Sequence, residues 1–158
     1  MEYVIESQNL SKTFRGYEKN PGFWSSIRSL WHRTYKENCA VDNFNLQVKP
    51  GEMIALLGPN GAGKTTIMKM WTGIIVPSGG KVQVIGHDPW KRDKQFRKKI
   101  ALVMGQKSQL WWDIPALDSF LLLQKYYEIP DQDFKQRLDM LSVLLQVQDK
   151  LKIHVRKL

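Results

Sequence analysis

Residues 58–65 hold the residue types that bind phosphate. They read Gly-Pro-Asn-Gly-Ala-Gly-Lys-Thr and match G-x-x-x-x-G-K-[ST] at every fixed position. Glycines let backbone N–H groups curl around phosphate oxygens that larger side chains would obstruct. Lys64 can reach the β- and γ-phosphates, and the Thr65 hydroxyl can enter the Mg²⁺ shell. We therefore predict that Mg²⁺ and ATP, or another nucleoside triphosphate, bind at Gly58, Pro59, Asn60, Gly61, Ala62, Gly63, Lys64, Thr65 and Thr66.

The flanking residues predict the elements that must position this segment. Residues 53–57 form a continuous apolar run, which is typical of a strand buried on both faces of a parallel sheet. Residues 65–72 predict a helix that ends at Gly73, and its N-terminal amides would point at the same anion. A strand, a loop and a helix are thus expected in immediate succession.

The rest of the chain predicts a mixed α/β protein. Tyr3, Ile5 and Leu10, and the alternation over residues 44–48, predict strands of an antiparallel sheet, with further strands around Val82 and over residues 100–104. Residues 91–99, residues 116–128 and the apolar stripe from Phe134 to Leu145 predict helices.

Composition narrows the classes of protein. The 158 residues, 42% of them hydrophobic, suit one modest domain or part of one. No apolar run approaches the roughly 20 residues that span a bilayer, so we expect a cytoplasmic protein. Cys39 is the single cysteine, which excludes an internal disulfide. The net charge of +9 suits phosphate, nucleic acid, an anionic membrane or simply a solvated basic surface.

Three segments resemble one family. Residues 57–66, L-G-P-N-G-A-G-K-T-T, look like the Walker A form of ABC-transporter nucleotide-binding subunits, and residues 40–52 and 77–86 resemble the neighbouring strands of that family. The resemblance implies an α/β P-loop NTPase fold of ABC type, with buried parallel strands, an antiparallel β-subdomain and the start of a helical subdomain at about 106–158. Residues 1–158 would then form one partial nucleotide-binding domain with an incomplete core.

The resemblance implies roles for two further residues. Gln106 follows the second buried strand, where the family places a glutamine that ligates Mg²⁺ or orients the attacking water. Phe14, in the segment N-L-S-K-T-F, matches the aromatic residue on which family members stack the adenine. The alternatives are a polar loop residue for Gln106 and a core side chain for Phe14.

Two features depart from the simplest family members. In an insertion at about 16–38, one helical face would carry Phe23, Trp24, Ile27, Leu30, Trp31 and Tyr35, and another Arg28, His32 and Lys36. Such a helix is expected to contact an anionic membrane surface, hold a partner helix, or pack on its own domain. Trp111 and Trp112 would contact the coupling helix of a membrane subunit or fill the seam between subdomains.

The resemblance implies an ATPase subunit that pairs head to tail with a second nucleotide-binding subunit. It would drive a transmembrane permease subunit from the cytoplasmic face, with export favoured. Hydrolysis in this family also uses a Leu-Ser-Gly-Gly-Gln signature, a Walker B strand ending in Asp-Glu and a switch histidine, none of which these residues contain; His154 precedes the signature position. We expect this chain alone to be truncated and marginally stable, and to bind ATP with little or no hydrolysis.

Three alternatives stay open. A soluble ABC-type ATPase acting on nucleic acid or the ribosome would use the basic charge, although we do not expect nucleic acid as the partner. A second alternative is a non-hydrolysing nucleotide-binding remnant. The last is a P-loop kinase, for which we find no acceptor site or lid.

Overall fold

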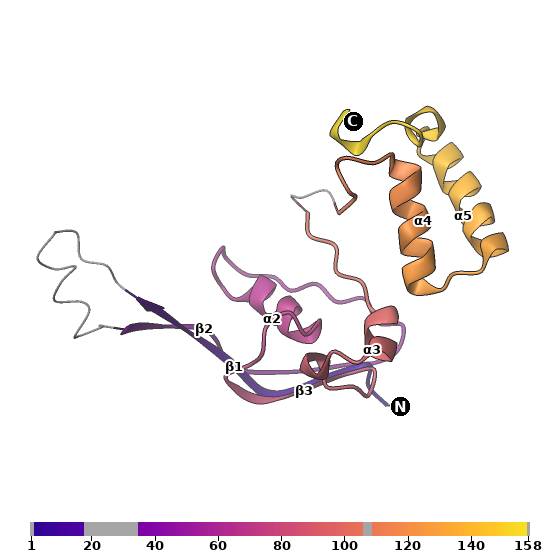
Figure 1. The fold of residues 1–158 in the computed structure, drawn as a ribbon. Coiled ribbons are helices and arrows are strands. Elements are labelled where there is room, and N and C mark those ends of the chain that lie inside the picture. Colours follow the sequence, from indigo (N-terminus) through magenta and orange to yellow (C-terminus); the bar gives the residue numbers. More distant parts are fainter. Residues whose placement is uncertain (1, 18–34, 106–108, 158) are drawn as a thin grey trace, which may run out of the picture. The chain divides into compact units, whose positions relative to one another are not determined.

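The computed structural model describes residues 2–17, 35–105 and 109–157. They divide into two compact units, Met1–Arg97 and Lys98–Leu158. The first unit contains a sheet and the helix α2, and the second contains the helices α4 and α5 (Figure 1). The phosphate-binding sequence therefore lies in the first unit.

The sheet of the first unit has three antiparallel strands in the order β2-β1-β3. Strand β1 spans Ile5–Tyr17, β2 spans Tyr35–Val48 and β3 spans Gly79–Val84. The central strand β1 pairs with both neighbours, and Leu10 in its middle is fully buried. The antiparallel sheet expected from the alternating residues is therefore confirmed.

Helix α2, Lys64–Trp71, packs on this sheet. Its buried residues Ile67 and Met70 are three positions apart and so lie on one face of the helix. At its C-terminal end the Trp71 indole donates a hydrogen bond of 2.9 Å to Ser7 Oγ on β1, and its ring centroid is 6.2 Å from that of Phe44 on β2. These contacts fix the helix that follows the phosphate-binding segment.

The chain beyond α2 turns at Gly73, as expected. Its φ is +74°, and a Cβ there would lie 2.1 Å from the Pro89 carbonyl oxygen, so no other residue fits. The single helix expected over residues 91–99 is instead a short turn, η1 (Pro89–Lys91), and the helix α3 (Lys94–Lys98). The break lies at Arg92, whose left-handed φ of 52° cannot continue a right-handed helix.

The second unit is helical. Helix α4 spans Ala116–Tyr127 and α5 spans Asp131–Leu144, close to the expected bounds, and two short turns follow, η2 (Gln148–Lys150) and η3 (Val155–Lys157). The buried Gln124 braces the connection, since its amide donates to Ile129 O at 3.2 Å and to Asp131 Oδ1 at 2.7 Å.

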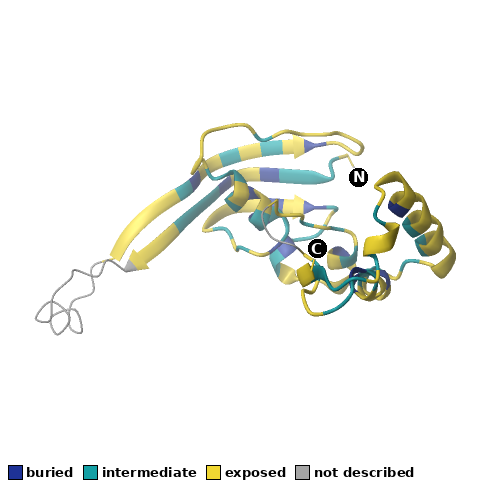
Figure 2. Ribbon diagram, turned by 90° about the horizontal axis from the view of Figure 1, so that it is seen from above, coloured by how far each residue is buried: buried dark blue, intermediate teal, exposed yellow. Residues whose placement is uncertain are grey.

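The two buried parallel strands expected over residues 53–57 and 100–104 are absent from the described structure. Met53 is 100% exposed, Leu57 90% and Val103 80%. Figure 2, coloured by burial, shows that exposed residues make up much of the ribbon. An apolar run becomes a buried strand only when neighbouring strands accept its hydrogen bonds and cover its faces. The three strands described here pair only with one another, so the parallel part of the core is missing, as an incomplete core implies.

The prediction of an amphipathic helix over the insertion is wrong at the C-terminal end of that segment. Tyr35 and Lys36 belong to β2, where they pair with Tyr17 and Gly16 of β1. The strand ladder satisfies their backbone groups, which outweighs a helical spacing of side chains. Residues 23, 24, 27, 28, 30, 31 and 32, which make up the rest of that helix, lie outside the described residues.

Candidate functional site

Residues 58–63 form an exposed loop that runs directly into α2. Gly58, Gly61 and Gly63 have φ values of 153°, 86° and 83°. Between them, the Ala62 amide donates to Pro59 O at 3.2 Å and closes a tight turn. Residues with a Cβ rarely adopt such φ values, so the glycines of the pattern define the path of the loop.

Gly63 is also where the loop meets the sheet. A Cβ at this position would lie 2.3 Å from Ala40 O and 3.0 Å from Val41 Cγ2 on β2. The backbone therefore passes too close to β2 for any side chain, and α2 begins immediately afterwards, with the Ile67 amide donating to Gly63 O at 2.9 Å. The start of the helix is thus anchored on β2.

Lys64, the first residue of α2, folds its side chain back over the loop. Its ammonium group donates to Gly58 O at 2.6 Å and to Pro59 O at 2.7 Å. Both acceptors are neutral carbonyls, and no carboxylate in the described part of the chain forms an ion pair with Lys64. The positive charge therefore lies at the loop and is not neutralised there.

Thr65 and Thr66 follow on the first turn of α2, Thr65 exposed and Thr66 half-buried. Residues 2–17, 35–105 and 109–157 contain no cluster of three His, Cys, Asp or Glu side chains that could hold a metal ion. Mg²⁺ does not need such a cluster beside a nucleotide, because it keeps several waters and binds phosphate oxygens with one or two protein ligands. An exposed hydroxyl next to Lys64 fits that type of coordination.

Phe14 lies near the end of β1 and is 39% exposed. The ammonium group of Lys12 is 5.2 Å from the centre of its ring. This exposure argues against a role in the core of the sheet, the alternative reading of Phe14, and leaves apolar ring surface for stacking.

The register of the β1–β2 pair relates Phe14 to the loop. Phe14 pairs with Asn38, two residues before the Ala40 carbonyl that Gly63 approaches. Residues 38–41 of β2 therefore contact the aromatic strand on one side and the start of α2 on the other. A base and its phosphates would be bound by adjoining parts of one unit.

Gln106, the proposed catalytic and Mg²⁺-binding residue, lies outside the described residues. Close by, the Gln109 side-chain amide donates to Leu102 O at 2.8 Å. Trp111 and Trp112 are exposed in the second unit, so their two proposed roles stay predictions. His154 forms an isolated β-bridge with Pro115, which gives it a structural place in that unit.

Two residues near Phe14 were missed by sequence reasoning. Lys12 lies beside the ring, and Ser78 hydrogen-bonds the backbone of Thr13. Both lie in segments that resemble the family, but the resemblance gives neither of them a role, and both act through contacts with residues more than 60 positions away. The one available signal was the position of Ser78 in the turn Pro-Ser-Gly-Gly, where a serine hydroxyl often bonds nearby backbone.

Comparison with known proteins identifies the family. The family model described as ABC transporter matches residues 41–157. Nod factor export ATP-binding protein I of Cupriavidus metallidurans is 29% identical over 126 residues, which cover 80% of this chain and 41% of the relative. The choline transport ATP-binding protein OpuBA of Bacillus subtilis is 32% identical over 135 residues, 85% of this chain and 30% of the relative. The chain thus spans less than half the length of these relatives.

Solved structures share the fold. An ATP-binding subunit of an ABC transporter superimposes with a TM-score of 0.72 at 21% identity, covering 94% of this chain and 53% of that one. The dimeric post-hydrolysis structure of the ATP-binding cassette MJ0796, bound to ADP and Pi, gives 0.66 at 20% identity, covering 95% and 60%. None of the helices in the described ranges is long and apolar enough to cross a bilayer. The chain belongs to the ABC transporter family and has, over part of its length, the P-loop fold of an ATP-binding subunit.

Proposed function

We propose that this chain binds Mg²⁺ and ATP through residues 58–66. The observation that carries the proposal is the glycine-shaped loop, anchored on β2 by Gly63, with the unneutralised Lys64 ammonium over it. A triphosphate would take the place of the Gly58 and Pro59 carbonyls as the acceptor of the Lys64 hydrogen bonds. The two carbonyls are neutral whereas phosphate oxygens carry negative charge, so this exchange adds electrostatic attraction to the ammonium group and favours binding.

The other site residues have complementary roles in this proposal. The amides at the start of α2, with Asn60, Ala62 and Thr66, would bind phosphate oxygens. Thr65 and Gln106 would hold Mg²⁺, which neutralises phosphate charge when bound, and Gln106 would orient the attacking water. Phe14 would stack on the adenine.

In the complete protein, the proposed function is ATP hydrolysis that drives export through a membrane permease. Several relatives are named Nod factor export proteins, which supports the direction, and one solved neighbour is a dimer with ADP and Pi, which supports pairing with a second nucleotide-binding subunit. Such a subunit would lie at the cytoplasmic face of the membrane. The 158-residue chain alone would bind ATP without turnover, and phosphate release from the isolated chain is the measurement that checks this.

The test of nucleotide binding compares ATP with AMP by isothermal titration calorimetry in the presence of Mg²⁺. AMP keeps the base and sugar but lacks the β- and γ-phosphates that Lys64 is proposed to hold. Hydrogen bonds to charged groups contribute about 1.5–3 kcal/mol each, so AMP should bind about 100-fold more weakly. Equal affinities for the two nucleotides would show that the loop is not the phosphate site.

The net charge of +9 favours a second candidate, an ABC-type ATPase that acts on nucleic acid. Binding of a basic protein to RNA or DNA releases counterions, so its affinity falls steeply with salt. Titration of labelled RNA between low and physiological salt distinguishes the candidates. A steep salt slope with tight binding would favour the nucleic-acid function over transport.

A further inference from the structure

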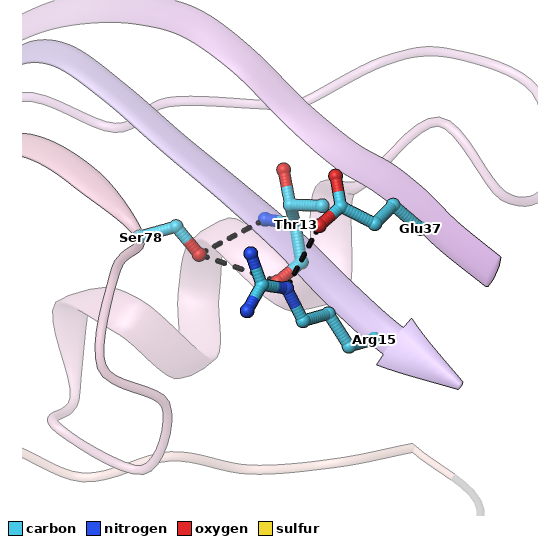
Figure 3. Close-up of polar contacts among 4 residues, drawn as sticks. All are labelled: Thr13, Arg15, Glu37 and Ser78. Atoms are coloured by element: carbon cyan, nitrogen blue, oxygen red, sulfur yellow. Dashed lines mark hydrogen bonds and ion pairs between the residues drawn. The ribbon is translucent and has the colours of Figure 1, made fainter. Parts of the chain in front are cut away.

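The loop that follows α2 leads into β3, which begins at Gly79, and extends the sheet beyond that residue. The β1–β3 ladder ends at the pair Ser11 and Gly79. Two residues further along β1, the Thr13 amide donates to Ser78 Oγ at 3.1 Å, and the same hydroxyl donates to Thr13 O at 3.2 Å (Figure 3). In an antiparallel ladder both backbone groups of one residue face the same neighbour. The Ser78 hydroxyl therefore takes the place of a missing strand residue.

A second contact joins the same loop to the aromatic ring. The Lys12 ammonium donates to Val76 O at 2.7 Å and lies 5.2 Å from the centre of the Phe14 ring. Lys12 and Phe14 are two positions apart on one strand, so their side chains leave the same face of it. A cation at this distance from a ring centre attracts the electron-rich face. Lys12 thereby holds the ring and the loop together.

The loop also continues directly from the phosphate-binding helix. The amides of Ile74 and Ile75 donate to Lys69 O on α2 at 2.9 and 3.0 Å, and residues 76–78 come next in the chain. Ser78 and Lys12 therefore connect the strand that carries Phe14 to the helix that begins with Lys64.

The other neighbour of Phe14 is weakly held. Arg15 Nε and Glu37 Oε1 form a cross-strand ion pair of 2.8 Å beside it (Figure 3), but the two side chains are 75% and 56% exposed. Exposed pairs of this kind contribute little, because water and salt screen the charges. Besides its ladder pair with Asn38 on β2, Phe14 therefore depends on two contacts with the loop, Ser78 on the backbone of the preceding Thr13 and Lys12 on the ring, and the ion pair offers a matched control.

We infer that Ser78 and Lys12 are positioning residues for the base of the bound nucleotide. They fix Phe14 so that the ammonium lies over one face of its ring and the base stacks on the other. The inference rests on the proposed function, in which Phe14 stacks the adenine.

The test measures dissociation constants of the full chain for ATP and for inorganic tripolyphosphate, which has no base, in the presence of Mg²⁺. Ser78→Ala and Lys12→Met should each weaken ATP binding about 3- to 10-fold and leave tripolyphosphate binding unchanged, since each loses part of the stacking of the base on the aromatic ring and none of the phosphate contacts. Ser78→Thr and Lys12→Arg keep the hydroxyl and the charge and should restore ATP affinity. Arg15→Gln should change neither ligand. The unchanged tripolyphosphate affinity also shows that each variant is folded.

Phe14→Ala separates the inference from the proposal beneath it. It should weaken ATP about 10-fold, and adding Ser78→Ala to it should have no further effect, since the serine acts through the ring. If Phe14→Ala weakens ATP while Ser78→Ala and Lys12→Met do not, the inference is wrong and adenine stacking stands. If Phe14→Ala leaves ATP unchanged, stacking itself is wrong. Equal weakening of ATP and tripolyphosphate by the serine or lysine variants would also overturn the inference.

Discussion

Gly63 has the strictest requirement of the residues in the loop. It combines a left-handed φ of 83° with a contact on β2 that leaves no room for a Cβ. Gly61 has nearly the same φ, 86°, but no atom lies within 4 Å of the position its Cβ would take. The two glycines share a conformation and differ in packing, which allows strain and collision to be measured separately.

Gly63→Ala should therefore destabilise the first unit more than Gly61→Ala. Strained backbone conformations cost about 1–3 kcal/mol, which applies to both variants, whereas the collision with the Ala40 carbonyl applies to Gly63 alone. Urea denaturation followed by circular dichroism measures the difference in unfolding free energy. Equal losses in the two variants would mean that the close approach of Gly63 to β2 does not occur.

Single residues differed in how well the sequence predicted them. The turn at the glycines and the helix that follows could be predicted because their pattern is local and the required φ values are properties of glycine itself. The binding roles of Lys64 and Thr65 stay predictions. Lys12 and Ser78 could not be predicted, because their contacts with Val76 and Thr13 join segments far apart in the chain. Patterns of spacing contain no information about such pairs.

At the scale of elements, the sequence predicted the helices and strands that pack against other elements of their own unit. The strands β1 to β3 and the helices α2, α4 and α5 were expected from alternation and helical periodicity. The prediction of strands over residues 53–57 and 100–104 was wrong. Apolar content indicates only that a segment can be buried, and the described residues supply no strand with which these segments could pair. The prediction of a helix at Tyr35 was wrong because a partner strand is present. Tyr35 pairs with Tyr17 of β1, and the helical spacing of side chains does not reveal that pairing.

Hydrogen exchange tests the state of residues 53–57. Met53 and Leu57 are almost fully exposed and the segment lies in no ladder, so its amides should exchange within seconds, near the rate of an unfolded chain. Peptides from the middle of β1, which is hydrogen-bonded on both sides, should exchange at least about 100-fold more slowly. Mass spectrometry of the deuterated chain gives both rates. Comparable protection of the two segments would mean that residues 53–57 do form a paired strand.

At the scale of the whole molecule, the matched residues are 80% and 85% of this chain but only 41% and 30% of two curated relatives. Large apolar side chains are exposed in both units, among them Leu57, Val103 and Leu144. Exposed apolar surface of this kind favours association. We therefore propose nucleotide binding for this chain, through the loop of residues 58–66, and transport for the complete protein.

The most direct test of phosphate binding by this loop uses two lysines of one helix. Lys64→Ala removes the ammonium group at the loop, and Lys69→Ala removes the same charge from the last turn of α2. Calorimetric titration with Mg²⁺ and ATP should show about 100-fold weaker binding for Lys64→Ala, the loss expected for charge-assisted hydrogen bonds, and a change within about twofold for Lys69→Ala. Equal ATP affinity in Lys64→Ala and the unchanged protein would contradict the assignment of the phosphate site.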